Sequence, residues 1–367
     1  MNSPSGAPFY QRLSFNLLTL ALITVGLFVG KDIILPFLFS ILLANILLPL
    51  IHYLIKIKFN KSFAILLPLV LTIIIGGSLI YFLSSQVMNF LDDVPALKVR
   101  VNEVSHSFQV WFRQTTSITI REQNKYITDT VSDLKDDGLF GLTFTSLTGI
   151  LSYLVLMPVY TFLLLYYRST IKDFLIHVFK NGSELKVSEV LTQSTKVAQQ
   201  YLTGLLIETL LVFTMNTIGF LILGVKYAIF LALLAAFLNL IPYVGILIAN
   251  VICMFITLAS TNEISHVIWV GIILAVVQLW DNNFGMPLIV GNKVRINALV
   301  TIIGVLIGGA LCGIPGMFLA IPGLAVLKVI FDKVPELTPW GMLLGDNSPA
   351  TFIEKIEATN NEDNVKP

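Results

Sequence analysis

Residues 62–88 read SFAILLPLVLTIIIGGSLIYFLSSQVM, and this run contains no charged side chain. A helix needs about 20 mostly apolar residues to cross the hydrocarbon core of a bilayer. The run exceeds that length, and the nearest charged residue is Lys61, directly before it. The sequence therefore predicts a membrane-spanning helix over residues 62–88.

The composition of the whole chain agrees with this prediction. Of its 367 residues, 56% are hydrophobic and 12% are charged, and the mean hydropathy is +0.84. A soluble domain carries about 25% charged residues, so this chain has too few charges to cover a water-facing surface. The net charge of +1 provides no basic field that would attract nucleic acid. We expect an all-α, polytopic integral membrane protein with the lipid bilayer as its surroundings.

Further apolar runs predict the other spans. The early runs are residues 13–30, 33–55, 145–167 and 201–223. The first of them is interpreted as a retained span, because no small-residue cleavage pattern follows it. The later runs are shorter, or are interrupted by polar residues, glycine and proline: residues 227–241, 244–259, 267–290, 298–312 and 317–331. The chain thus changes after residue 223 from plain apolar runs to broken ones.

Two stretches between the spans have a single apolar face, with apolar residues at steps of three and four. In residues 91–138 these are Val94, Leu97, Val101, Val104, Phe108 and Trp111, with Ile127, Val131 and Leu134 on a second helix. In residues 168–200 they are Ile171, Phe174, Leu175 and Val178. We expect a helical hairpin at 91–138, lying on the membrane or a neighbouring subunit or capping a ligand site. Interfacial helices are expected at 168–200.

Basic residues in the connecting segments predict the orientation, since Lys and Arg concentrate on the cytoplasmic side. The short loop after the second span holds Lys56, Lys58 and Lys61 and no acid. Residues 168–200 are also rich in lysine, whereas residues 91–138 contain more acids than bases. We therefore expect both termini in the cytoplasm and residues 91–138 outside it.

Several polar residues lie at predicted membrane depth, where they are costly and need an explanation. Glu208 and Asn239 lie in or near the fifth and sixth apolar runs. Gln278, Asp281 and Asn282 are spaced three and four apart, so they share one face of a helix. A carboxylate with two amides can bind a cation, a proton or a hydroxyl-rich solute. The alternative is that each residue makes a packing hydrogen bond between helices, which is the interpretation given to Asn45 and Asn216.

Proline and glycine break two of the later apolar segments. A proline leaves a backbone carbonyl without its helical donor, and in a membrane such groups are buried in protein or line a cavity. The two breaks are Ile241–Gly245 and Gly313–Gly316. Broken helices of this kind occur at transporter binding sites, so re-entrant hairpins are one hypothesis. Ordinary tight turns between short helices are the other.

The order of these motifs over residues 201–333 resembles the autoinducer-2 exporter family of bacterial membrane permeases. The motifs that carry the resemblance are Tyr201-Leu202-Thr203-Gly204, Asn239-Leu240-Ile241-Pro242-Tyr243-Val244-Gly245, Gln278 with Asp281-Asn282, Pro287-Leu288-Ile289-Val290-Gly291, Ile307-Gly308-Gly309-Ala310 and Gly313-Ile314-Pro315-Gly316. The chain departs from the family pattern at Asn297-Ala298, where many members have His-Pro. It departs again at Thr203-Gly204-Leu205, where many have Arg-Gly-Gln. Both departures weaken any transfer of a substrate.

The resemblance implies a permease of the bacterial inner membrane with about eight spans and re-entrant elements. It also implies a homo-oligomer, with a pentamer suspected, and export of autoinducer-2 or sodium–proton exchange. We therefore expect a secondary transporter that exports a small polar solute, with a sodium- or proton-coupled antiporter as the alternative. A membrane scaffold without transport is the alternative from another class. The four histidines are scattered, and the sequence has neither a nucleophile motif nor a phosphate-binding loop. We therefore expect that the protein is not an enzyme and that it uses neither a metal nor a cofactor.

These expectations divide the chain into five segments: residues 1–90 with three spans, 91–144 as the outer insertion, 145–200 with the fourth span and cytoplasmic amphipathic helices, 201–333 as the transport core, and 334–367 as a tail with a disordered end. The predicted substrate or ion pathway is formed by Glu208, Asn239, Pro242, Gly245, Gln278, Asp281, Asn282 and Pro287. The predicted hinges or re-entrant turns are Gly291, Gly309, Gly313, Pro315 and Gly316.

Overall fold

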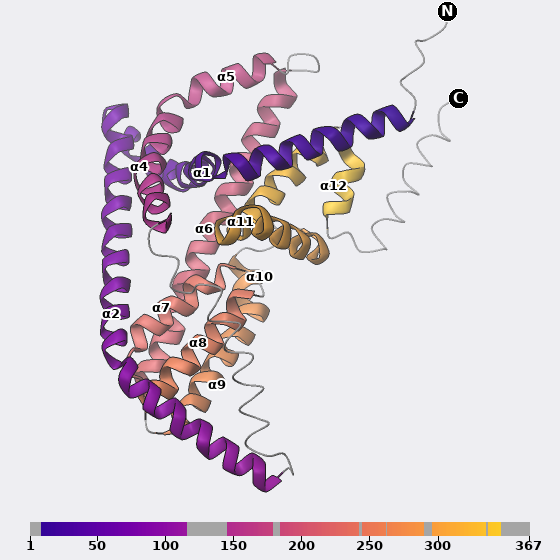
Figure 1. The fold of residues 1–367 in the computed structure, drawn as a ribbon. Coiled ribbons are helices and arrows are strands. Elements are labelled where there is room, and N and C mark those ends of the chain that lie inside the picture. Colours follow the sequence, from indigo (N-terminus) through magenta and orange to yellow (C-terminus); the bar gives the residue numbers. More distant parts are fainter. Residues whose placement is uncertain are drawn as a thin grey trace, which may run out of the picture. The chain divides into compact units, whose positions relative to one another are not determined.

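A computed structural model of the chain describes residues 9–115, 145–178, 184–241, 244–261, 263–289, 296–334 and 337–345. In these residues the regular structure is helical, apart from an isolated bridge between Ile296 and Gly345. Within these described ranges, five helices are long and apolar enough to cross a membrane, and three apolar helices are shorter. The protein is an all-α, polytopic membrane protein, as the composition predicts (Figure 1).

The first two predicted spans are a single helix, α1 (Phe9–Lys56), so the prediction of a break between residues 30 and 33 was wrong. Lys31 and Asp32 interrupt the apolar run, but charged residues are compatible with a helix and do not end it. Pro36 and Pro49 both lie inside α1. The helix ends at Lys56, and Lys58 then adopts a left-handed conformation, with φ of 69°, before α2 begins.

Helix α2 (Lys61–Thr115) joins the third predicted span to the first helix of the predicted insertion. The helix predicted over Val94 to Trp111 is therefore present, as the second half of α2 and without a break from the third predicted span. The predicted second helix of that hairpin, around residues 127–134, lies outside the described residues.

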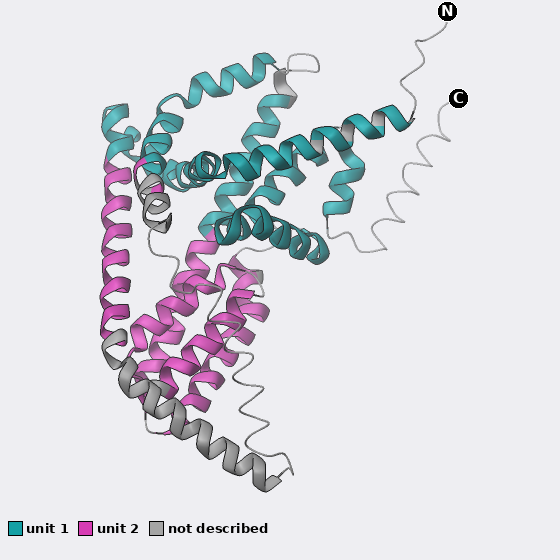
Figure 2. Ribbon diagram, in the orientation of Figure 1, with its two compact units in different colours: residues 1–66, 156–203, 292–367 teal, residues 67–155, 204–291 magenta. Residues whose placement is uncertain are grey.

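The chain forms two compact units, and each is built from segments that are far apart in the sequence (Figure 2). Unit 1 contains residues 1–66, 156–203 and 292–367, and unit 2 contains residues 67–155 and 204–291. The five segments predicted from the sequence stay a prediction, because compactness alone does not test them.

Unit 1 packs α1 against the second half of α4 (Thr145–Tyr166) and against α11 (Ala298–Lys333). The hydroxyl of Ser40, in α1, donates to the backbone oxygen of Met157, in α4, over 2.9 Å. The rings of Phe39 and Phe318 stack with centroids 5.7 Å apart. The short helix α12 (Thr338–Leu344) packs on α11.

The predicted interfacial segment at 168–200 divides into two parts. Helix α5 (Arg168–Val178) is a separate amphipathic helix, and none of its residues is buried. Residues 184–200, in contrast, form the first half of the long helix α6 (Glu184–Ile222), which continues into the fifth predicted span. The prediction of interfacial helices stays a prediction for this second part, which is continuous with the fifth predicted span.

Helix α11 is broken at Gly313, whose backbone (φ 65°, ψ −152°) is not helical. Beyond this break the chain folds back on itself, since a β-carbon at Gly304 would lie 2.6 Å from Leu324 and one at Gly309 would lie 2.5 Å from Met317. Gly308 and Gly316 approach so closely that a β-carbon on either would overlap the backbone oxygen of the other. The predicted break is confirmed, and glycine is required there because no other residue permits this approach.

Unit 2 packs α7 (Ala228–Asn239), α8 (Val244–Ser260) and α9 (Ile264–Trp280) side by side (Figure 1). Its core contains the completely buried side chains of Phe220, Leu231, Cys253 and Val270. At about 1.5 Å per residue, α7 is roughly 18 Å long, which is too short to cross a bilayer core of about 30 Å. Helix α9 continues into the π-helical turn η1 (Asp281–Gly285) and then α10 (Met286–Ile289).

Candidate functional site

Two carboxyl groups meet inside unit 2. Glu208 lies in the middle of α6 and is 5% exposed, while Asp281 is the first residue of η1 and is 2% exposed. Their side chains interact directly, close enough for the two carboxyl groups to share a hydrogen bond. The sequence indicated both acids separately but not their contact, since they lie on helices far apart in the chain.

Asn239 completes this cluster from the last position of α7. Its amide nitrogen donates to Oδ2 of Asp281 over 3.3 Å. The other oxygen of Asp281, Oδ1, and Oε2 of Glu208 are both buried and have no hydrogen-bond partner among the described residues. Three predicted site residues are thus brought together, and two of their oxygens stay free to accept a proton or to bind a cation.

Gly285 allows the carboxyl group of Asp281 to occupy this position. A β-carbon at Gly285 would lie 2.5 Å from Oδ1 of Asp281 and 3.0 Å from the ring of Trp280. The residues from Asp281 to Gly285 form one π-helical turn, a rare element that often lies at functional sites. The wider turn and the missing side chain together make room for the carboxyl group.

A small cavity of about 20 Å³ lies beside the cluster in unit 2. Amide side chains from four helices line it, and one of them, Asn239, also contacts Asp281. The lining residues are Val212, Asn216, Ala235, Asn239, Ile246, Ala249, Asn250, Leu274, Val277 and Gln278. A volume of this size accommodates roughly one water molecule, so a larger solute would enter only after the helices separate.

The surroundings of Asn216 do not provide the packing hydrogen bond that the sequence suggested for its side-chain oxygen. Asn216 is 1% exposed, yet its Oδ1 atom has no hydrogen-bond partner among the described residues. An unsatisfied buried amide costs stability, so it needs a reason other than packing. Its place in the cavity lining makes it a candidate ligand-binding residue.

The structure divides the predicted polar face of α9. Gln278 donates to Oδ1 of Asn282 over 2.9 Å, and Asn282 is exposed. Asp281 is instead buried against Asn239 and Glu208. Gln278 therefore belongs to the cavity, whereas Asn282 lies outside it, because successive residues lie about 100° apart around a helix and Asn282 does not point the same way as Asp281.

The predicted breaks lie in different units. Gly245, in unit 2, follows the turn between α7 and α8, and a β-carbon there would overlap the backbone oxygen of Leu238. Pro242 and Gly291 lie outside the described residues, and Pro287 lies in α10. The other predicted hinge residues belong to the broken helix α11 of unit 1: Gly309, Gly313, Pro315 and Gly316.

Sequence reasoning missed Gly285 and Asn250. Gly285 follows Asp281 by four residues, so it lies over the acid on the same helix face, and that spacing is a usable signal. Asn250 is an amide within the apolar helix α8. Because a polar side chain is costly at membrane depth, its presence in this apolar run could have marked it as a candidate site residue.

Broken apolar helices around buried carboxyl and amide groups define the class of the protein, a multi-pass membrane protein built like a permease. A family model described as AI-2E family transporter matches residues 17–336. The chain therefore belongs to this family, and the membership supports a function in transport rather than catalysis.

Relatives with known names agree with this assignment. The chain is 26% identical over 315 residues to YueF of Bacillus subtilis (strain 168), a transport protein by name, covering 82% of this chain and 84% of YueF. It is 23% identical over 361 residues to YhhT of Escherichia coli (strain K12), also a transport protein by name, covering 96% and 99%. PerM of the same strain, named as a permease, is 27% identical over 203 residues, covering 54% and 57%.

Proposed function

We propose that this chain is a secondary transporter that exports a small polar solute and couples this movement to a monovalent cation. The observation that carries the proposal is the contact between Glu208 and Asp281 inside unit 2. Membership in the AI-2E transporter family supports the general function in transport. The solute, the direction and the coupling ion belong to the proposal.

The chemistry of the acid pair supports cation coupling. Two carboxylates close together in a poorly solvated site repel each other, and each loses hydration when it is buried. One proton shared between them, or one sodium ion bound by their oxygens, removes this repulsion. Oxygen ligands suit hard cations, and the free oxygens Oε2 of Glu208 and Oδ1 of Asp281 are available. A proton and a sodium ion would therefore compete for the same pair.

Asn239 connects the ion site to the solute site. It donates to Asp281 and also lines the cavity with Asn216, Asn250 and Gln278. Amide groups both donate and accept hydrogen bonds, so this lining suits a solute rich in hydroxyl or carbonyl groups. A change of charge at Asp281 would alter the hydrogen bond of Asn239 and thereby the affinity for solute. Autoinducer-2 or a related signal or metabolite fits this chemistry.

The broken helices supply the movement that transport requires. The cavity is too small for a solute in this conformation, so α7 and α8 must move relative to α6 or α9. Short, interrupted helices such as α7 and α8 are the kind of element that surrounds the binding site in secondary transporters, where access alternates by movement of one bundle against another.

The antiporter alternative rests on the same acid pair. A protein that exchanges sodium for protons needs one site that binds either ion, and Glu208 with Asp281 provides it. The four amides around the cavity favour an additional solute, because ion exchange alone does not require them. In either form the chain would act in the bacterial inner membrane as a homo-oligomer, with a pentamer as the expected assembly.

Flux through proteoliposomes tests the proposal. The full-length chain is reconstituted with autoinducer-2 inside, and efflux is followed with and without inward proton or sodium gradients. We expect a gradient to accelerate efflux by wild type, and Asp281→Asn to abolish this acceleration. Unchanged gradient dependence in Asp281→Asn would overturn the coupling. Sodium–proton exchange without any autoinducer-2 efflux would favour the antiporter.

A further inference from the structure

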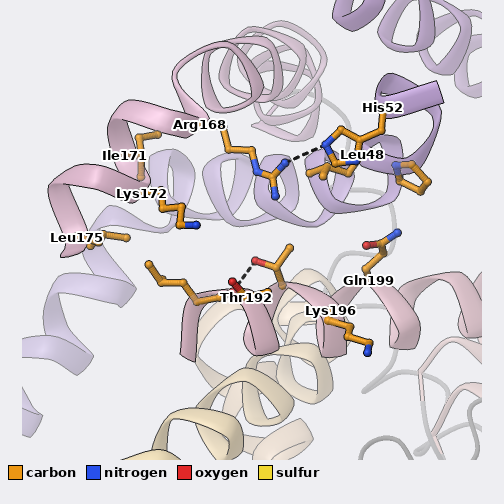
Figure 3. A pocket seen from close by; sticks show the side chains of 12 residues that line it. Leu48, His52, Arg168, Ile171, Lys172, Leu175, Thr192, Lys196 and Gln199 are labelled. Carbon is orange, nitrogen blue, oxygen red and sulfur yellow. Dashed lines mark hydrogen bonds between the residues drawn. The ribbon is translucent and has the colours of Figure 1, made fainter. Parts of the chain in front are cut away.

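A second, larger cavity lies within unit 1, away from the residues assigned to transport. Its volume is about 420 Å³, and it is bounded by α1, α5 and α6 (Figure 3). The lining residues are Leu48, Pro49, His52, Arg168, Ile171, Lys172, Leu175, Leu191, Thr192, Thr195, Lys196 and Gln199. This volume is within the usual range for small-molecule sites, about 300–1,000 Å³.

The charged residues of this cavity all have one sign. Arg168 and Lys172 come from α5 and Lys196 from α6, and the lining contains no acid. The guanidinium of Arg168 lies 3.2 Å from Nε2 of His52, as the dashed line in Figure 3 marks. Because arginine only donates, Nε2 of His52 must accept this hydrogen bond. Among the described residues neither Lys172 nor Lys196 has a carboxylate partner. The positive charge of the lining therefore favours binding of an anion.

The remaining lining is apolar, which indicates that the anion is part of an amphiphile. Leu48, Ile171, Leu175 and Leu191 line the cavity beside the basic residues. Helix α5 also exposes Phe174 and Val178, at 63% and 55%, as an amphipathic helix on a bilayer surface would. A soluble anion would gain nothing from this apolar surface.

Aromatic residues next to α5 place the cavity at the boundary between membrane and water. Tyr166 and Tyr167, exposed at the junction between α4 and α5, are typical of membrane interfaces. Nζ of Lys61 donates to the backbone oxygen of Tyr166 over 2.7 Å and lies 4.9 Å from the centre of its ring. Basic pockets between helices at this depth bind anionic lipid headgroups.

We propose that this cavity binds the phosphodiester headgroup of an anionic phospholipid. The phosphate is bound by Arg168 and Lys172 from α5, and Lys196 from α6 adds positive charge to the lining. The acyl chains lie along the apolar residues of α1 and α5. This inference is independent of the proposed function, because it concerns other residues and is tested by lipid binding instead of flux.

Native mass spectrometry of the full-length chain tests it, with an equimolar mixture of phosphatidylglycerol and phosphatidylcholine added in detergent. Wild type should retain phosphatidylglycerol selectively. The double variant Lys172→Gln, Lys196→Gln should bind it about 25-fold more weakly, since each basic residue near a lipid surface contributes roughly a fivefold change in affinity. Lys172→Arg, Lys196→Arg should retain the lipid, which separates loss of charge from loss of fold.

A matched control removes the same charge elsewhere. The variant Lys31→Gln, Lys226→Gln changes two lysines that do not line the cavity, and it should bind like wild type. Equal retention of phosphatidylglycerol by wild type and by Lys172→Gln, Lys196→Gln would overturn the proposal. So would complete displacement of the lipid by equimolar inorganic phosphate, because the cavity would then be a site for a free anion.

Discussion

The α-carbon of Gly285 faces the carboxyl group of Asp281 so closely that a β-carbon would lie 2.5 Å from Oδ1. Both residues belong to the same π-helical turn. The contact means that the position of the acid depends on the absence of a side chain four residues later. Gly285 therefore helps to form the proposed ion site by leaving room for the acid, although it does not bind the ion itself.

Replacing this glycine should weaken cation binding without unfolding the protein. In Gly285→Ala the carboxyl group of Asp281 must turn away from Glu208 and Asn239. We expect cation affinity about tenfold lower, similar to other changes that misplace an ion ligand. The measurement is the sodium concentration that gives half-maximal acceleration of efflux.

The control for this variant is Gly76→Ala, which adds a methyl group to α2 where nothing lies within 4 Å. It should leave the sodium dependence unchanged and stabilise the helix slightly. If Gly285→Ala kept the wild-type sodium dependence, Asp281 would not require its present position.

The tight glycine contact in α11 predicts a loss of stability. In Gly316→Ala the added methyl group overlaps the backbone oxygen of Gly308, and backbone cannot move aside as a flexible side chain can. We expect the free energy of unfolding to fall by about 2 kcal/mol, as for other overpacked sites. Thermal unfolding in detergent measures it.

Gly323→Ala is the comparison on the same helix, because a β-carbon there meets nothing within 4 Å. Its transition temperature should equal or exceed that of wild type. Equal stability of the two variants would mean that the chain does not fold back closely at Gly313.

Asn216 should show opposite effects on stability and on transport. Its Oδ1 atom is buried without a partner among the described residues, so Asn216→Leu removes an unsatisfied polar group of similar volume. We expect the free energy of unfolding to rise by about 1 kcal/mol. Efflux should fall, because the cavity loses one of its amides. The two quantities are measured on the same preparation.

Thr257→Val serves as the reference, because Thr257 is completely buried but its hydroxyl already donates to the backbone oxygen of Cys253 over 2.7 Å. This variant should not gain stability and should transport normally. Asn216→Leu with reduced stability and normal efflux would return Asn216 to a role in packing.

The sequence predicted the parts of the fold that depend on local chemistry. Uncharged runs such as residues 62–88 indicated helices in a membrane, and Gly313 marked the break that divides α11. It did not predict that residues 30–33 continue as helix, because charged residues divide an apolar run in hydropathy without ending the helix itself.

The candidate site was predicted as a set of residues but not as an arrangement. Burial cost identified Glu208 and Asp281 one at a time. Their contact depends on the packing of α6 against η1, which no spacing within either helix contains. The π-helical turn at Asp281–Gly285 was also not predicted, because no residue pattern in the sequence marks it.

The proposed coupling requires that Glu208 and Asp281 form one site for which a proton and a sodium ion compete. Purified protein in weakly buffered detergent at neutral pH is mixed with sodium chloride, and the released protons are counted against a choline chloride reference. Wild type should release about one proton per chain, because a cation that binds to a protonated site displaces the proton.

Glu208→Gln and Asp281→Asn should each release none. Glu263→Gln, which changes an acid of unit 2 whose side chain is 68% exposed, should release as much as wild type. No sodium-dependent release by wild type, or undiminished release by Glu208→Gln and Asp281→Asn, would contradict the central claim.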